Sequence, residues 1–267
     1  MTHFALTDML YVALFFYAAG TLIALISLVT RNKRPQLLGL LLMIAGFVTH
    51  TVWIGTICAK TGHPPITNLP ETASFVAWTV FAVELGLYIR YRVYAASFFV
   101  YPLVLLLLSI AAVVGEPFAH LDPLLRSSLF TTHLLLSTVG VAALLIGLAF
   151  TMLAYVQDRS LKSKKVGALW DLIPSLNVCK MVSYRALAIG FSIYTVGLIT
   201  GVLWSYRTTA DLMVPNAKEI GAVVAWIFFA ILLQSFVSGV FRGRRTIVLS
   251  ACAFAATLVA ILGIAHG

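Results

Sequence analysis

Long apolar segments constrain this chain more than any other feature of its sequence. Eight of them run approximately over 8–30, 36–58, 71–89, 95–115, 128–156, 184–205, 219–240 and 246–265. A helix of about 20 residues crosses the hydrocarbon core of a bilayer. Backbone groups cannot stay unpaired in lipid, and these segments are too long for barrel strands, so we predict helices. The predicted fold is an all-α, polytopic membrane helix bundle with about eight transmembrane helices, the long fifth of which tilts or emerges from the membrane.

The composition agrees with this prediction. Hydrophobic residues make up 61% of the chain and charged residues only 10%, which excludes an ordinary soluble domain. The 267 residues contain no long polar stretch. The first apolar segment lacks a basic leader, so we interpret it as a membrane span and not as a cleaved signal. We therefore expect a single integral-membrane domain over residues 1–267.

The distribution of Lys and Arg predicts the orientation. The net charge is +9, but the basic residues lie in short blocks between apolar segments, which is typical of topology signals and not of a nucleic-acid interface. Of the 18 Lys and Arg residues, all but four fall in alternate loops; the other loops hold Lys60, Arg126, Arg207 and Lys218. The positive-inside rule then places both termini outside. We expect a multi-pass protein of the bacterial inner (cytoplasmic) membrane with periplasmic termini.

Three histidines are the main functional candidates: His50, His133 and His266. An ionisable group inside a membrane is costly and marks a functional site by default. Neutral imidazole is also well suited to bind haem iron. In the predicted topology His133 and His266 lie near the outer face, as an axial pair would, and His50 lies roughly 12 Å below it. The alternative is that each histidine only bonds a neighbouring helix or water.

Other residue types limit the chemistry. Cys58, Cys179 and Cys252 form no CxxC pair and no CxxCH motif, so any haem would be noncovalent haem b. No nucleophile–base pair and no metal-hydrolase spacing is present, which favours a non-enzyme. Glu84 is a candidate buried carboxylate, and we expect it to pair with a basic side chain, with a proton or ligand role as the alternative.

Several motifs carry a family resemblance. Residues 62–71, GHPPITNLPE, followed by Ser74-Phe75 and Trp78, are similar to the GHFPLSNLYES-x-x-F-x-x-W motif of the cytochrome c assembly family, which includes the CcsA, ResC and HemX types. His50 resembles the membrane histidine that precedes this motif. The segment around His133 resembles the family's MHV-x-x-x-x-SYAAL segment.

Later segments extend the resemblance over nearly the whole chain in the same order. Residues 174–176, 183–185 and 189–191 resemble the LPSL…SYR…IGF run of the family. Residues 197–204 are similar to GILSGAVW, which precedes the haem-binding loop. His266 resembles the second external ligand histidine.

The chain also departs from the family's haem synthetases. They carry a tryptophan-rich WGxYWxWDPKE segment, whereas residues 205–219 here retain only Lys218-Glu219 and one aspartate, Asp211, of that pattern. They also carry a histidine in the next helix, where this chain has Gln234. This pattern resembles the HemX-like branch more than a complete cytochrome c synthetase.

The resemblance implies roles for individual residues. His133 and His266 would be the axial ligands of an external haem, and His50 a ligand or contact of a second, membrane-embedded haem. Trp204 would lie at the external site. Arg207 or Lys218 would pair with a haem propionate.

Three functions remain open at this point. The first is a haem-binding protein that moves haem for cytochrome c maturation, together with a maturation partner that presents reduced cysteines. The second is a membrane regulator of a haem-biosynthesis enzyme such as glutamyl-tRNA reductase, which the basic segment 159–180 would dock. The alternative for this segment is contact with anionic membrane lipid. The third is a b-type electron-transfer protein.

Overall fold

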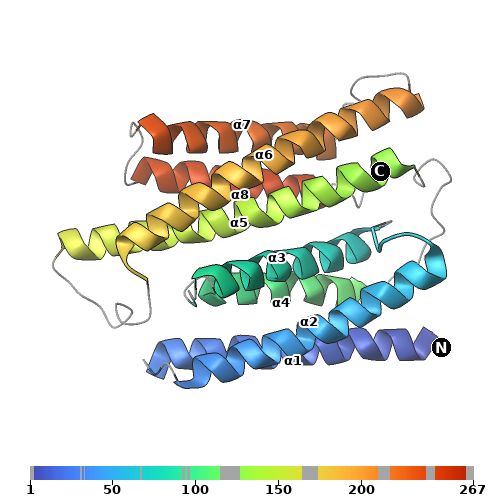
Figure 1. Cartoon of the computed structure of the whole chain (residues 1–267), viewed down its shortest axis with the longest axis horizontal. Helices are drawn as coiled ribbons and strands as arrows, with labels where there is room; N and C mark the ends of the chain where they lie inside the picture. The colour runs from blue at the N-terminus through green and yellow to red at the C-terminus, as the bar shows by residue number, and fades with distance from the viewer. Residues whose placement is uncertain are drawn as a thin grey trace. The chain divides into compact units, whose positions relative to one another are not determined.

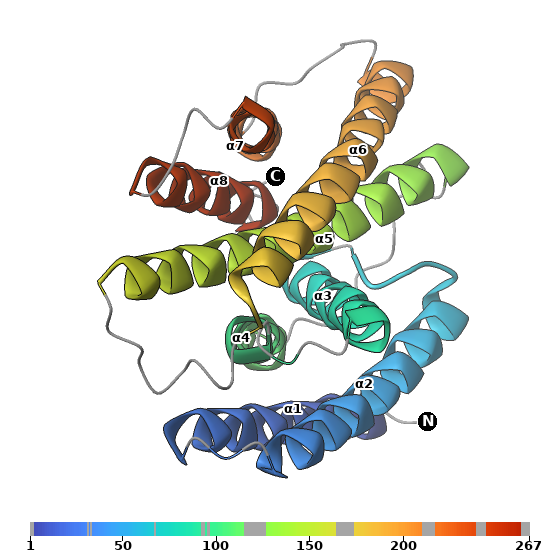
Figure 2. The same ribbon diagram turned by 60° about the vertical axis from the view of Figure 1, so that its left-hand side comes forward.

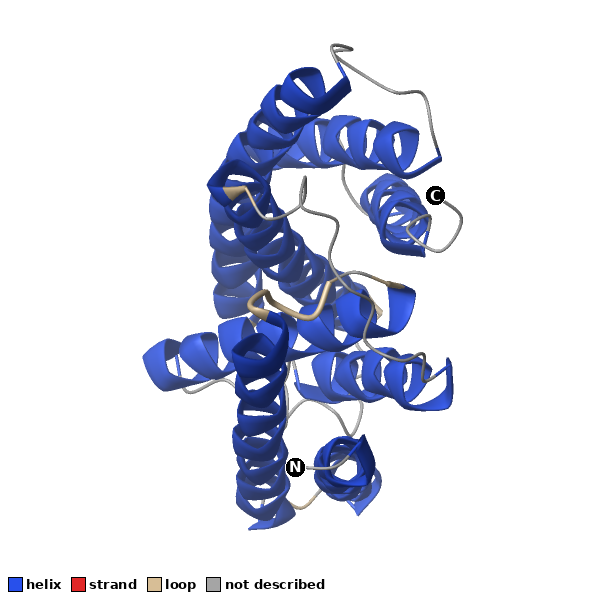
Figure 3. Ribbon diagram, turned by 90° about the vertical axis from the view of Figure 1, so that its right-hand side faces the viewer, coloured by secondary structure: helices blue, strands red, loops and turns tan. Residues whose placement is uncertain are grey.

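The computed structural model describes residues 3–30, 32, 34–66, 68–91, 94, 97–114, 127–163, 174–209, 217–238 and 244–262. The regular secondary structure of these residues is helical, and short described loop segments join it (Figure 3). The helices are α1 (His3–Thr30), α2 (Arg34–Thr61), α3 (Leu69–Tyr91), α4 (Ser97–Val114), α5 (Ser128–Lys162), α6 (Leu176–Thr209), α7 (Ala217–Ser238) and α8 (Arg244–Leu262). The all-α prediction is confirmed.

Two helices extend beyond their apolar segments. α5 continues past the predicted end at 156 to Lys162, and α6 begins at Leu176, well before the predicted 184. The extension of α5 is polar and basic, whereas that of α6 mixes apolar residues with Asn177, Lys180 and Ser183. A helix continues through such residues because its hydrogen bonds are local to the backbone, whereas hydropathy reports only the part that lies in lipid.

Seven of the described helices, α1 to α7, are long and apolar enough to cross a membrane. Many of their large apolar side chains point outward: Phe15 is 67% exposed, Val29 80% and Val113 85%. A water-soluble protein rarely exposes apolar patches of this extent. The chain is therefore a multi-pass membrane protein, and these outward faces are the surfaces that contact lipid.

The chain divides into two compact units, and each is described by itself. The first contains α1 to α4 (Figure 1). Within it α1 packs along α2, α3 packs along α4, and α1 also contacts α4. The core of this unit includes the fully buried side chains of Tyr17, Met43, His50 and Phe81.

The second unit contains α5 to α8, and its main feature is the close approach of α5 and α6 (Figure 2). A Cβ atom added at Gly140 would lie 2.7 Å from the backbone nitrogen of Tyr194, and one at Gly190 would lie 2.9 Å from that of Leu144. Small residues let two helix backbones meet at such distances. We call this line of glycines, Gly140 and Gly147 on α5 and Gly190, Gly197 and Gly201 on α6, the glycine seam.

Local signals fix the ends of the helices that carry the candidate residues. Ser127 caps α5, and its hydroxyl accepts a hydrogen bond from the backbone nitrogen of Phe130 at 3.1 Å. Asn68 caps α3 in the same way, accepting from the nitrogen of Glu71 at 2.9 Å. Gly62 ends α2 with a φ of 76°, a conformation that favours glycine.

Candidate functional site

His133 lies one and a half turns into α5, where the glycine seam begins. The sequence folds this way because the Ser127 cap starts the helix and the small residues of α6 admit the imidazole. The Nδ1 atom of His133 is 2.7 Å from the carbonyl oxygen of Gly197 on α6. A weaker contact of 3.4 Å joins Nδ1 to the hydroxyl of Ser137 one turn along α5.

This geometry determines which ring nitrogen carries the proton. A carbonyl oxygen can only accept a hydrogen bond, so Nδ1 of His133 must donate to Gly197. The neutral imidazole then carries its lone pair on Nε2. In metal sites, a carbonyl that holds one ring N–H in this way orients the histidine ligand.

The aromatic ring of Phe130 lies near the imidazole of His133 and also packs against Trp204. The ring of Phe130 lies 6.4 Å from that of His133 and 5.0 Å from that of Trp204, centroid to centroid. In the described part of the chain, the buried indole N–H of Trp204 finds no acceptor. A buried donor without a partner is costly and suggests a missing group. We call Phe130, His133, Gly197, Gly201 and Trp204 the His133 cluster.

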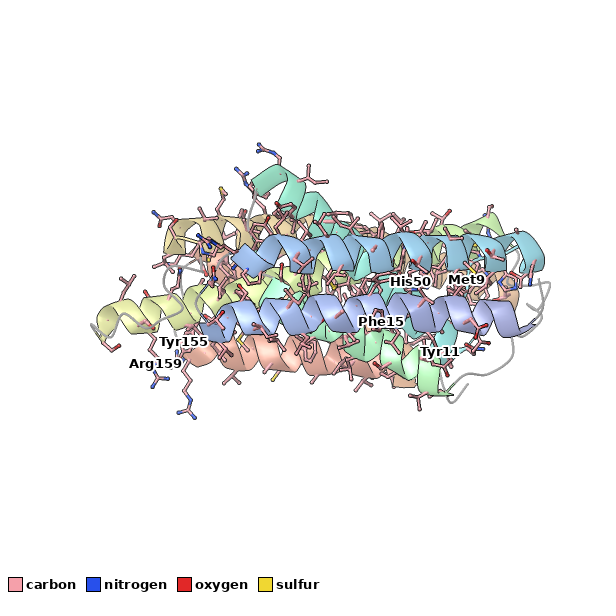
Figure 4. All side chains as sticks on the ribbon, turned by 90° about the horizontal axis from the view of Figure 1, so that it is seen from below. Met9, Tyr11, Phe15, His50, Tyr155 and Arg159 are labelled. Carbon is pink, nitrogen blue, oxygen red and sulfur yellow. The ribbon has the colours of Figure 1, made fainter. Side chains whose placement is uncertain are left out.

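His50 has a different environment, between three helices of the first unit. Its side chain is fully buried. Nε2 is 2.7 Å from the hydroxyl of Ser74 on α3, and Nδ1 is 3.5 Å from the hydroxyl of Tyr17 on α1. Trp53, one turn along α2, packs against the imidazole. We call Tyr17, His50, Trp53 and Ser74 the His50 cluster; Figure 4 labels His50 on α2 beside α1.

The two histidines differ in what contacts their ring nitrogens. His133 is half-buried, its Nδ1 is held by a carbonyl, and an unpartnered indole N–H lies in the same cluster. A neutral histidine whose Nδ1 is held by a carbonyl keeps its lone pair on Nε2, and its role as an iron ligand stays a prediction. His50 is enclosed instead: Nε2 is bonded to Ser74 and the ring of Tyr17 packs edge-on against the imidazole, so its role toward a haem stays a prediction.

The remaining predicted residues are only partly described. Arg207 is exposed in the last turn of α6, one turn beyond Trp204. Lys218 lies in the first turn of α7, with its side chain outside the description. His266 lies outside the described residues, so its pairing with His133 stays a prediction. Gln234, at the position of the synthetases' histidine, is exposed on α7.

Sequence reasoning missed the partners of these side chains. Glu84 is buried as expected, but among the described residues its hydrogen-bond partner is the hydroxyl of Ser97, at 2.8 Å, and not a basic side chain. Nothing in the local sequence marks Ser74 or Tyr17 as partners of His50. The four-residue spacing of Gly197 and Gly201 was a usable signal, because small residues at this spacing mark close helix contacts.

The chain is similar to proteins of one family. The family model described as "Cytochrome C assembly protein" matches residues 66–266. This range contains His133, the α6 glycines, Trp204 and His266, and it begins after His50.

Individual relatives agree with this match. The cytochrome c biogenesis protein CcsA of Prochlorococcus marinus (strain MIT 9301) is 28% identical over 226 residues, which cover 76% of this chain and 73% of the relative. The CcsA protein of Mesostigma viride is 25% identical over 261 residues, covering 88% and 85%. That of Guillardia theta is 25% identical over 240 residues, covering 83% and 80%.

Proposed function

The chain belongs to the cytochrome c assembly protein family, and we propose that it is a membrane protein of cytochrome c biogenesis that binds haem b and hands it on at, or across, the membrane. Its relatives named for cytochrome c biogenesis match most of its length. We further propose that it lies in the inner membrane of a bacterium and works with a maturation partner that supplies the cytochrome's cysteines. It would be a haem carrier and not a complete synthetase.

One observation carries the haem proposal. The hydrogen bond from Nδ1 of His133 to the carbonyl of Gly197 leaves the lone pair of the imidazole on Nε2. A neutral histidine in this tautomer is prepared to bind iron without first losing a proton. The carbonyl also fixes the plane of the ring, as hydrogen-bond acceptors at the other ring nitrogen do for histidine ligands of metals.

The other residues of the external site would support the bound group. Haem supplies an iron that changes oxidation state and a macrocycle with two carboxylates. The indole N–H of Trp204 and the guanidinium of Arg207 would donate to those carboxylates. His266 would be the second axial ligand. In this proposal the external site, and not His50, holds the first haem.

The test is a reduced-minus-oxidised absorption spectrum of the detergent-purified protein. Wild type, His133→Ala, His266→Ala and His50→Ala are compared after each has been supplied with haem. We expect low-spin bands in wild type, their loss in the His133 and His266 variants, and their retention in His50→Ala. Circular dichroism of each variant checks that the helices remain.

Other results would change the proposal in defined ways. A spectrum that loses part of its intensity in His50→Ala would show a second haem and would favour electron transfer between two haems. Wild-type protein that stays colourless after haem is supplied would overturn the haem proposal.

A second candidate function rests on the basic side chains at the opposite end of the α5–α6 pair. Arg159, Lys162 and Lys180 are exposed there, where α5 ends and α6 begins. They would dock an acidic surface of a haem-biosynthesis enzyme, as a regulator requires. Charge reversal at these three positions should then abolish co-purification of glutamyl-tRNA reductase and leave the haem spectrum unchanged.

A further inference from the structure

We propose that the backbone of α6 positions the candidate iron ligand: Gly197 sets the tautomer of His133 through its carbonyl, and Gly201 provides the space in which the imidazole lies. Both would be positioning residues that act through His133. The inference rests on the proposed function for what His133 binds. The position of the His133 imidazole follows from its contacts with α6, whatever the histidine binds.

The first step concerns Gly197. Its carbonyl oxygen is 2.7 Å from Nδ1 of His133, although the two residues are 64 positions apart in the chain. The same oxygen also accepts a hydrogen bond from the hydroxyl of Thr200 at 2.8 Å, so two donors contact it. α5 can lie this close to α6 because Gly197 has no side chain. A Cβ at Gly197 would lie 2.9 Å from the backbone nitrogen of Ser137.

The second step concerns Gly201, one turn further along α6. A Cβ added there would lie 2.6 Å from Cε1 and 2.7 Å from Nδ1 of His133. Real Cβ atoms do not approach other atoms this closely, so the imidazole must move when the side chain is enlarged. A ring that moves away from Gly201 loses the fixed direction of its hydrogen bond to Gly197.

The third step separates this role from helix packing in general. Gly190 also belongs to the glycine seam, and a Cβ there would lie 2.9 Å from the backbone nitrogen of Leu144. It lies 11 residues before Gly201, roughly 16 Å along the helix. Gly86 on α3 has nothing within 4 Å of an added Cβ. The chain therefore offers one glycine that touches the imidazole, one that touches only the seam, and one that touches neither.

The experiment compares Gly201→Ala, Gly190→Ala and Gly86→Ala with wild type in detergent or nanodiscs. Histidine labelled with ¹⁵N reports by NMR which ring nitrogen is protonated, and His133→Gln assigns the signal. We expect a protonated Nδ1 in wild type, Gly190→Ala and Gly86→Ala, and its loss in Gly201→Ala. Haem affinity should fall about ten- to a hundredfold in Gly201→Ala and change little in Gly86→Ala.

A double variant keeps the test decisive if Gly201→Ala folds poorly. In His133→Ala the imidazole is absent, so the added Cβ of Gly201→Ala has room. We expect Gly201→Ala to lower the Tm of wild type and to leave the Tm of His133→Ala unchanged, a coupling that a double-mutant cycle measures. Equal losses of Tm in both backgrounds would overturn the role of Gly201.

The remaining outcomes distinguish this inference from the proposed function. A wild-type His133 protonated on Nε2 would overturn the role of Gly197. A fall in haem affinity in Gly190→Ala as large as in Gly201→Ala would overturn positioning in favour of seam packing. If Nδ1 is protonated and the coupling is found, but wild type binds no haem, the positioning of His133 stands and the proposed function fails.

Discussion

His50 and His133 are both histidines of apolar helices, yet their surroundings differ in kind. His50 contacts side chains from two other helices, Ser74 and Tyr17, and is fully enclosed. His133 contacts a backbone carbonyl, lies against a glycine, and is half-buried. In the His50 cluster, the histidine links α2 to α1 and α3 through side-chain contacts. In the His133 cluster, the histidine of α5 contacts the backbone of α6.

The difference lies in which ring nitrogen is engaged. Ser74 is bonded to Nε2 of His50, and this hydroxyl can either donate or accept, so the tautomer of His50 is open. The carbonyl of Gly197 can only accept a hydrogen bond, and it contacts Nδ1 of His133. A backbone carbonyl therefore fixes the tautomer of a neutral imidazole, whereas a side-chain hydroxyl leaves it open.

The largest expected effect is on stability at His50. His50→Ala should lower the free energy of unfolding by about 3 kcal/mol, because it leaves a cavity and deprives Ser74 of its partner. His133→Ala should lower it by only about 1 kcal/mol, since that ring is half-buried and its removal leaves a smaller cavity. Unfolding in detergent measures both. A larger loss at His133 than at His50 would contradict the comparison.

The glycine seam should give the next largest effect. Gly140→Ala is expected to lower the free energy of unfolding by about 2 kcal/mol, because the new Cβ meets the backbone of Tyr194. Gly86→Ala is the matched control in the first unit; it should raise stability by up to about 1 kcal/mol, since alanine favours a helix. If both variants behave alike in thermal unfolding, close packing does not hold α5 to α6.

Ser74 provides a smaller and sharper test of the two clusters. Ser74→Ala removes the hydroxyl bonded to Nε2 of His50 and should cost about 1 kcal/mol of stability. Ser137→Ala, its counterpart at His133, should change stability little because that contact is 3.4 Å long. Neither should alter the haem spectrum. A changed spectrum in Ser74→Ala would instead make His50 an iron ligand.

The smallest effect is expected at the helix caps. Ser127→Ala removes the cap of α5, a turn and a half before His133, and should cost about 0.5 kcal/mol of stability. Asn68→Ala removes the corresponding cap of α3, before Ser74, at a similar cost. Hydrogen exchange at the first turn of each helix measures both. Protection factors that stay unchanged would show that packing, not capping, starts these helices.

The helices themselves were predictable from the sequence, because crossing lipid demands long apolar segments. Each of the eight predicted segments is a helix, and seven of the described helices, α1 to α7, are long and apolar enough to span a membrane. The ends differ mainly where α5 runs on to Lys162 and α6 begins early at Leu176. His133 and Trp204 were singled out as site residues; in the structure Phe130 lies near both, and their role stays a prediction. The pairing with His266 and the side chain of Lys218 lie outside the described residues.

The sequence by itself determined the class of fold, the positions of the membrane helices and the identity of the polar residues within them, since each depends on local composition. Only the tertiary structure decided which nitrogen of each histidine is engaged and by what. His50 and Ser74 are 24 residues apart, and His133 and Gly197 are 64. Such contacts depend on how close two helices come, and that distance is set by side-chain volumes along both of them at once.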